Sequence, residues 1–120
     1  MSIINIPHQE PLIFAKEVLH KDDKTSQVLC KFDFVPTLAI FIEAAAQSSA
    51  SFKDLKKDQI GFLTTTKNIK KENDILSKEY IFNITLEIDL GNISKFSFEA
   101  FDTVNNIKTV SGEFTVVLQE

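Results

Sequence analysis

"IFIEAAAQSSA", residues 40–50, is the most informative segment of this chain for predicting its fold. Wound into a helix it is apolar almost all round, and only Glu43 and Gln47 interrupt it, four residues apart and therefore on one face. Pro36 precedes it at what would be the first helical turn, where its missing N–H group costs nothing. Alanine and long aliphatic residues favour helix, so the sequence predicts a helix over residues 37–55.

Outside this helix the pattern indicates antiparallel β-strands. Segments 11–20 and 25–32 mix apolar and β-branched residues on either side of the polar turn 21–24, which predicts a hairpin. After the helix, apolar and polar residues alternate, so each strand would bury one face and expose the other. The strands expected there span 59–71, 79–90, 93–101 and 109–118, with turns at Gly91-Asn92 and 103–106. The residues expected to face inward are Phe82, Ile84, Leu86, Ile88, Phe96, Phe98, Ala100, Val110, Phe114, Val116 and Leu118.

The order of these elements indicates a single α+β domain that spans all 120 residues. Two strands come first, then one helix, then about four strands. A helix that is apolar on every side must be surrounded. A strongly curved antiparallel sheet wrapped around one long central helix would surround it, and that arrangement is the hotdog fold. An α+β sheet with a helix lying across one face also fits the pattern.

Composition argues against several classes of protein. The chain is 43% hydrophobic and 25% charged, as ordinary globular proteins are. Its net charge of −4 argues against bulk binding of nucleic acid or anionic membranes, and its 13 basic residues are all lysine. The single cysteine, Cys30, cannot form an internal disulfide. Because there is no signal-peptide pattern and no apolar run near the roughly 18 residues of a membrane span, we expect a cytoplasmic location.

Three stretches, taken in order along the chain, carry a resemblance to a known family. "IPHQEPLIFAKEVL" (6–19) has a Pro-His pair and a later proline before the first strand. "VPTLAIFIEAAAQSSA" (35–50) has a proline, then aliphatic residues, then Glu-x-x-x-Gln, and "IGFLTTTKNIKKENDIL" (60–76) has a strand glycine before a polar stretch. Together they resemble the β-hydroxyacyl-carrier-protein dehydratases of the hotdog fold. The likeness is strongest to the dehydratase-like proteins of aryl-polyene-type biosynthesis.

The loop before the helix departs from that family. The family's catalytic histidine lies in a Gly-His-Phe-Pro loop, whereas "CKFDFVPT" (30–37) is shorter and contains no histidine. The resemblance therefore carries over Glu43 as the catalytic glutamate but supplies no loop histidine. His8, in the opening Pro-His pair, is the remaining imidazole with a motif context, and we predict it as the second catalytic residue.

The resemblance also implies a set of substrate-binding residues. Gln47 matches the glutamine one turn after the family's glutamate, and Gly61 matches the strand glycine whose N–H group faces the thioester carbonyl. Phe62, the next residue of that strand, and Pro36, at the start of the helix, complete the predicted set.

Dehydration of a 3-hydroxyacyl thioester explains why such residues would be needed. The reaction removes a proton α to the carbonyl and protonates the departing hydroxyl group, so it requires a base, an acid and N–H donors for the developing enolate oxygen. Glu43, against apolar walls, could serve as the acid, and Gly61 together with the first helical turn could supply donors. The sequence has neither metal-ligand spacing nor a glycine-rich phosphate loop, so we expect no metal and no other cofactor.

Simpler interpretations of these residues stay open. Glu43 and Gln47 could form the solvated or dimer-facing stripe of the helix as an ordinary i,i+4 pair. His8 could cap a turn near the N-terminus, and His20, just before the polar turn, is expected on the surface. Cys30 is expected in the core or in the wall of an acyl tunnel, with no basic neighbour in the sequence to activate it.

The charge pattern bears on partners. Residues 53–71 hold six lysines against two aspartates, a local charge of +4. Acyl carrier proteins are strongly acidic, so this patch would attract one, although a solvated helix end would look the same in sequence. We expect an acyl-carrier-protein or coenzyme A thioester as partner, no nucleic acid, no membrane span and, from the resemblance, a homo- or heterodimer.

Three functions are compatible with these features. The first is a 3-hydroxyacyl thioester dehydratase, a hydro-lyase of fatty-acid or polyene-type biosynthesis that uses Glu43 and His8. The second is a catalytically silent hotdog subunit that pairs with an active paralogue, as the shortened loop suggests. The third is an acyl thioesterase, in which Glu43 would activate water and no histidine would be required.

Overall fold

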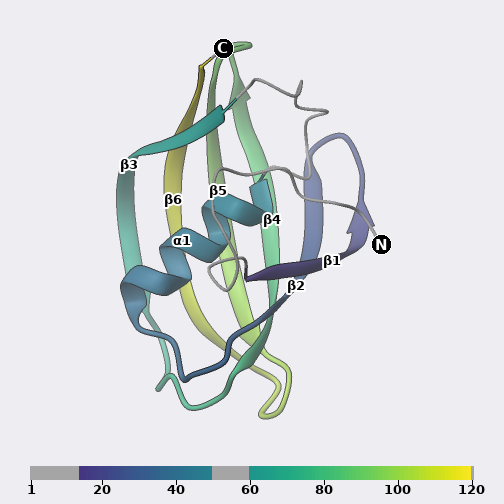
Figure 1. Cartoon of the computed structure of the whole chain (residues 1–120), viewed down its shortest axis with the longest axis vertical. Coiled ribbons are helices and arrows are strands. Elements are labelled where there is room, and N and C mark those ends of the chain that lie inside the picture. The colour runs from purple at the N-terminus through teal and green to yellow at the C-terminus, as the bar shows by residue number, and fades with distance from the viewer. Residues whose placement is uncertain (1–13, 50–59, 120) are drawn as a thin grey trace.

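The computed structural model describes residues 14–49 and 60–119, which form one α-helix and six β-strands (Figure 1). The elements in chain order are β1 (Ala15–Lys21), β2 (Thr25–Lys31), α1 (Leu38–Ser49), β3 (Ile60–Lys71), β4 (Glu79–Asp89), β5 (Ile93–Asp102) and β6 (Ile107–Gln119). This order of two strands, one helix and four strands is the predicted one. The observed β1 begins at Ala15, whereas the predicted strand begins at residue 11. Residues 11–13 lie outside the described part of the chain, and Phe14 precedes the strand.

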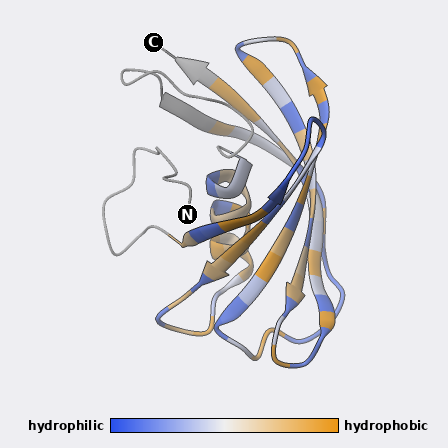
Figure 2. Cartoon of the chain, turned by 90° about the vertical axis from the view of Figure 1, so that its right-hand side faces the viewer, coloured by the Kyte–Doolittle hydropathy of each residue, from blue (hydrophilic) through white to orange (hydrophobic). Residues whose placement is uncertain are grey.

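All six strands belong to one antiparallel sheet with the order β1-β2-β4-β5-β6-β3, so β1 and β3 are its two edges. The sheet is strongly curved, and α1 lies in its hollow (Figures 1 and 2). The predicted curved sheet around a helix is therefore confirmed. Within the described part of the chain, α1 has 12 residues, and Thr37, where the predicted helix starts, precedes it. Its predicted continuation to Leu55 lies outside that part.

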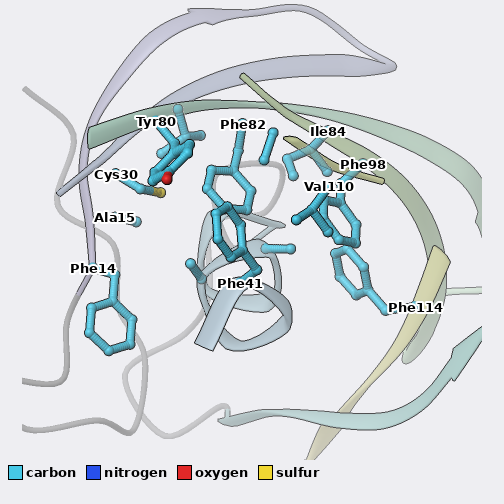
Figure 3. Packing of buried hydrophobic residues seen from close by; sticks show 14 of the residues in the cluster. Phe14, Ala15, Cys30, Phe41, Tyr80, Phe82, Ile84, Phe98, Val110 and Phe114 are labelled. Carbon is cyan, nitrogen blue, oxygen red and sulfur yellow. The ribbon is translucent and has the colours of Figure 1, made fainter. Parts of the chain in front are cut away.

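One side of α1 packs against the middle of the sheet. Phe41 is fully buried, and its ring centroid lies 4.7 Å from that of Tyr80 and 5.7 Å from that of Phe82, both in β4 (Figure 3). Ala44 and Ala45 are also fully buried, and their small side chains let the helix backbone approach the sheet. Burial of this apolar area stabilises the fold by about 25 cal/mol per Å².

The inward face of the sheet continues this core across β4, β5 and β6. The ring centroid of Phe98 lies 6.0 Å from that of Phe82 and 5.9 Å from that of Phe114 (Figure 3). The predicted inward residues that are buried are Phe82, Ile84, Phe96, Phe98, Ala100, Val110 and Phe114. Leu86 and Val116 are partly buried against this core, and the side chain of Leu118 is not among those that the structure describes.

The prediction that Ile88 faces inward is wrong. Its side chain is 49% exposed. The register between β4 and β5 shifts between Leu86, which pairs with Phe96, and Ile88, which pairs with Lys95. A β-bulge inserts an extra residue and turns the following side chains to the opposite face. The unbroken alternation in the sequence contains no sign of this bulge.

A second irregularity bends β3 over β6. The register of β3 against β6 shifts between Lys67 and Lys70, and Asn68 there has a φ of 55°. Ile69 turns inward into the space beside Gly112. A Cβ atom at Gly112 would collide with the Cδ1 atom of Ile69 and lie 3.2 Å from its Cα atom. Glycine is required at this position because the backbone of the neighbouring strand comes so close.

The turns lie where the sequence predicts them. Gly91, in the turn between β4 and β5, has a φ of 88°, which favours glycine. Asp102 ends β5 and is only 1% exposed. Its Oδ1 atom accepts hydrogen bonds from the backbone N–H groups of Val104 (2.8 Å) and Asn105 (3.1 Å). These bonds close the predicted turn 103–106.

Candidate functional site

One side of α1 is not covered by the sheet. Leu38 and Ala39 are exposed, and Ile42, Glu43 and Ala46 are half-buried. We call these five residues the open side of α1. The prediction that the apolar helix is surrounded holds only in part among the described residues. The open side is otherwise apolar, and Glu43 is the one carboxylate in α1.

Gln47 is buried at the start of β1. Its side chain is 2% exposed, and its Oε1 atom accepts hydrogen bonds from the backbone N–H groups of Phe14 (2.8 Å) and Ala15 (3.4 Å). The N–H group of Lys31 donates to the carbonyl of Phe14 (3.0 Å), which joins the same point to β2. Gln47 thus fastens an edge strand to the central helix, and the alternative of a solvated stripe is wrong for this residue.

Glu43 lies one helical turn before Gln47, on the open side of α1. The residues one turn away from it are Ala39, Ile40, Ala46 and Gln47, so three of its four helical neighbours are apolar. Its half-buried side chain can be reached from solvent. A carboxyl group in such a position can exchange a proton with a molecule bound against the apolar surface.

Thr37 caps the first turn of α1. Pro36 is buried, and the Oγ1 atom of Thr37 accepts a hydrogen bond from the N–H group of Ile40 (3.3 Å), as an N-cap residue does. The N–H group of Phe41 donates to the carbonyl of Thr37 (3.1 Å). The first turn contains no acidic residue, so the positive end of the helix dipole can act on a polarised or anionic group.

Gly61 and Phe62 lie in β3, at the opposite edge of the sheet from β1. Their backbones pair with Leu118 and Val117 of β6. Because α1 contacts both β1 and β3, the structure places Gln47 against one edge strand and Gly61 in the other, with the helix between them. In the described chain β3 pairs with a strand on one side only, so its other side could present backbone N–H groups to a ligand.

The structure brings no imidazole to Glu43 within the residues that it describes. His8, the predicted base, lies outside them. His20 is the one histidine within them, and it is exposed near the end of β1, as predicted, with Nε2 3.8 Å from Oδ2 of Asp22. In the same segments, no group of three His, Cys, Asp or Glu side chains could hold a metal ion.

Cys30 is an inert residue of the core. It is fully buried, and its Sγ atom lies 3.4 Å from Oγ of Ser48, which donates a hydrogen bond to the carbonyl of Ala44 (2.8 Å). Burial raises the pKa of the Cys30 thiol to about 12. The thiol therefore stays protonated at neutral pH and is unsuited to nucleophilic attack, in agreement with the predicted core position.

The loop before α1 exposes apolar side chains that the sequence-based prediction did not include. Phe34 is 45% and Val35 46% exposed. The ring of Phe34 meets that of Phe14 edge-on, with centroids 6.4 Å apart, so the loop extends the open side of α1 toward β1. The signal in the sequence is "FDFVPTL" (32–38), which carries a single charge where a solvated loop would be more polar.

Neither the sequence profile of a known protein family nor the sequence of a curated protein matches the chain significantly, but solved structures do. One is the dehydratase heterocomplex ApeI:P from Xenorhabdus doucetiae, with a TM-score of 0.77, 14% identity and coverage of 96% of this chain and 88% of that chain. A variant of a thioesterase from Staphylococcus aureus matches with a TM-score of 0.65, 11% identity and coverage of 87% and 93%. A hot-dog-like protein from Thermanaerovibrio acidaminovorans matches with a TM-score of 0.63, 14% identity and coverage of 91% and 85%.

These similarities show the fold and nothing finer. Together with the six-stranded antiparallel sheet and its single helix, they confirm the predicted hotdog α+β fold. The neighbours named for an activity are a dehydratase complex and a thioesterase, and a shared fold passes neither activity to this chain. In the described part of the chain, no helix is long and apolar enough to cross a membrane.

Proposed function

Since this chain is a hotdog-fold protein, we propose that it acts on acyl thioesters as a 3-hydroxyacyl thioester dehydratase, with Glu43 as its catalytic carboxylate. The observation that carries this proposal is the half-buried position of Glu43 on the otherwise apolar open side of α1. An acyl chain requires an apolar surface, and dehydration requires a proton-exchanging group beside it. Gln47 supports the arrangement, because it holds the edge strand β1 against the helix one turn away.

The proposed reaction converts a 3-hydroxyacyl thioester into an enoyl thioester and water. Glu43 would give a proton to the departing hydroxyl group, and His8 would take the proton from the α-carbon. The N–H group of Gly61 and a backbone N–H group in the first turn of α1 would stabilise the enolate oxygen as hydrogen-bond donors. Phe62 and Pro36 belong to the proposed substrate-binding set, and the mechanism uses no cofactor.

A second function is favoured by the loop before the helix. Residues 30–37 hold no histidine, and Phe34 and Val35 in that loop are exposed together with the open side of α1. A catalytically silent subunit that pairs with an active paralogue would have these two properties. One structural neighbour is a dehydratase heterocomplex by its name, which gives this alternative support.

We propose an acyl carrier protein or coenzyme A as the carrier of the acyl group, in the fatty-acid or polyene-type biosynthesis of the cytoplasm. Lys67, Lys70 and Lys71 are exposed on β3. The other three lysines of the basic stretch lie outside the described residues. A strongly acidic carrier protein would be attracted to this strand, and the attraction would weaken as salt is added.

Hydration of a crotonyl thioester tests the proposal. Purified protein is compared with Glu43→Gln and His8→Ala, using both a coenzyme A and a carrier-protein substrate. Removal of a general acid should lower the rate by about 10²–10⁴-fold, so we expect that loss for Glu43→Gln. Glu87→Gln is the matched control, because Glu87 is exposed and accepts a hydrogen bond from Ser97 (2.7 Å) on the other face of the sheet.

The four possible outcomes separate the candidate functions. Loss of turnover in both variants supports a His8/Glu43 pair, and loss in Glu43→Gln alone leaves His8 a structural residue. No turnover by the unmodified protein with either substrate contradicts the dehydratase and favours the silent subunit, which should gain activity with a paralogue. Release of free thiol from the substrate would identify an acyl thioesterase.

A further inference from the structure

The chain enters β1 directly beside α1. The backbone N–H group of Phe14, the first described residue, donates a hydrogen bond to Oε1 of Gln47 in the helix (2.8 Å). The ring of Phe14 also meets the ring of Phe34 edge-on, with centroids 6.4 Å apart. The segment that precedes Phe14 therefore starts at the helix, next to the exposed loop before α1.

The surface next to this point is apolar and exposed. Phe34 is 45%, Val35 46% and Leu38 36% exposed, and they are followed by Ala39 and Ile42 on the open side of α1. The sheet does not cover this surface, because α1 packs against the sheet with its opposite side. Since soluble proteins rarely leave a large apolar patch uncovered, such a surface usually marks a contact.

Residues 1–13 have a composition that suits such a surface. Their sequence, "MSIINIPHQEPLI", contains three isoleucines, Ile3, Ile4 and Ile6, together with one acidic side chain and no lysine. Its two prolines disfavour a helix and favour an extended chain. An extended apolar segment can lie flat along one side of a helix and bury aliphatic side chains against it.

The length of this segment allows it to follow the helix. An extended chain advances at most about 3.3 Å per residue, so His8 can lie up to roughly 20 Å from Phe14. A helix rises about 1.5 Å per residue, so Glu43 lies only about 6 Å and Leu38 about 14 Å along α1 from Gln47. His8 can therefore reach Glu43, and the isoleucines before His8 can reach Leu38.

A second copy of the chain could cover the same surface, but the covalent connection at Phe14 favours the segment of the same chain. A short tether holds its segment at an effective concentration in the millimolar range. A separate molecule would have to bind the surface at the much lower concentration of the protein in solution.

We propose that residues 1–13 lie along the open side of α1 in their own chain, with their three isoleucines against Leu38 and its apolar neighbours. This placement would bring His8 to Glu43 without a second subunit. The pairing of His8 with Glu43 deepens the proposed function and rests on it, whereas the covering of the helix does not.

The reactivity of an introduced thiol tests the covering in the full chain. Leu38→Cys places a thiol beneath the proposed segment, and Leu19→Cys in β1 is the matched control, because Leu19 is similarly exposed (44% against 36%). The native Cys30 is fully buried and should not react. Alkylation by iodoacetamide, followed by mass spectrometry, should be about tenfold slower at position 38 than at position 19, as for a surface that is covered about nine-tenths of the time.

Substitutions in the segment identify what covers the thiol. Ile3→Ser, Ile4→Ser and Ile6→Ser together should raise the rate at position 38 about tenfold and leave the rate at position 19 unchanged. Equal rates at the two positions before these substitutions would overturn the proposal. Protection that disappears on dilution would overturn it in favour of a second copy, and protection that survives the serine substitutions would overturn it in favour of another cover. Should Leu38→Cys fail to fold, Val35→Cys takes its place.

The rates of alkylation are measured without substrate, so they do not depend on turnover. Protection without hydration of a crotonyl thioester would contradict the proposed function alone. Hydration without protection would contradict the proposed covering alone.

Discussion

The two sides of α1 are made of similar residues but differ in what covers them. On the closed side, Phe41 and Ala45 are fully buried against the sheet. On the open side, Leu38 is 36% exposed and Glu43 is half-buried. The same helix is thus a core element along one stripe and a surface along another. Both stripes consist mostly of apolar residues, so residue type does not tell which stripe is buried. The curvature of the sheet decides which stripe it covers.

The difference separates residues that hold the scaffold from residues that can meet a substrate. On the closed side, Gln47 accepts hydrogen bonds from the start of β1, and Ser48 donates one to the carbonyl of Ala44. Their bonds are made to the chain itself, as buried polar groups require. Glu43, one turn from Gln47, lies where solvent and a ligand can reach it. Substitutions on the closed side should therefore change stability, whereas Glu43 should change activity.

Truncation of Phe41 should produce the largest loss of stability. Phe41→Ala removes a fully buried ring that lies against Tyr80 and Phe82, so we expect the free energy of unfolding to fall by about 3–5 kcal/mol. Urea unfolding followed by circular dichroism measures this loss. Leu38→Ala on the open side is the control and should cost less than about 1 kcal/mol. A comparable loss at Leu38 that grows with protein concentration would show that a second subunit covers the open side.

Removal of the Gln47 acceptor should lower the free energy of unfolding by an intermediate amount. Gln47→Leu leaves the buried N–H groups of Phe14 and Ala15 without this partner, which should cost about 1–3 kcal/mol. Hydrogen exchange of these two amides should become faster, while exchange in the middle of β4 changes little. Glu43→Gln, one turn away, is expected within about 0.5 kcal/mol of the unmodified protein. If Gln47→Leu lowers only the affinity for substrate, its predicted role in substrate binding is the correct one.

Asp102, at the end of β5 and away from both sides of α1, should make a smaller contribution to the free energy of unfolding, and this contribution should depend on pH. Burial alone would raise the pKa of Asp102, but hydrogen bonds, first from Ser77 and then from Asn105, outweigh it and hold the pKa below its usual value. A folded-state pKa below that of the unfolded chain means that the stabilisation is complete above about pH 4 and is lost as the pH falls through the folded-state pKa.

Asp102→Asn tests this dependence. The variant should be less stable than the unmodified protein at pH 7 by about 1 kcal/mol, and the difference should shrink as the pH falls below about 4. Urea unfolding at a series of pH values measures it. A difference that is the same at pH 7 and pH 3 would mean that the ionised carboxylate adds nothing beyond what an amide oxygen supplies.

Much of the fold could be predicted from the sequence because it depends on local patterns. Alternation of apolar and polar residues located β4, β5 and β6, and the turn at Gly91 follows from the conformational freedom of glycine. Ile88 could not be placed correctly, since a β-bulge reverses the alternation without changing the pattern of residue types. The inward turn of Ile69 beside Gly112 likewise depends on how two distant strands meet.

The candidate site could be predicted only as a set of residue types. Glu43 and Gln47 were singled out together, because four residues separate two polar side chains in an apolar helix. Their opposite roles could not be foreseen, since one role depends on the N–H groups of Phe14 and Ala15, which are more than 30 positions away.

The element order, the apolar central helix and the one carboxylate on that helix could be inferred from the amino-acid sequence alone, whereas the curvature of the sheet was one of two arrangements that fitted the pattern. These features depend on short-range periodicity and composition, which the chain carries within each segment. Contacts in the folded chain show which stripe of α1 is covered, that Gln47 is buried against the start of β1, and that Glu43 stays accessible. Those properties depend on the curvature of the sheet and on contacts between segments far apart in the chain, which no local pattern contains.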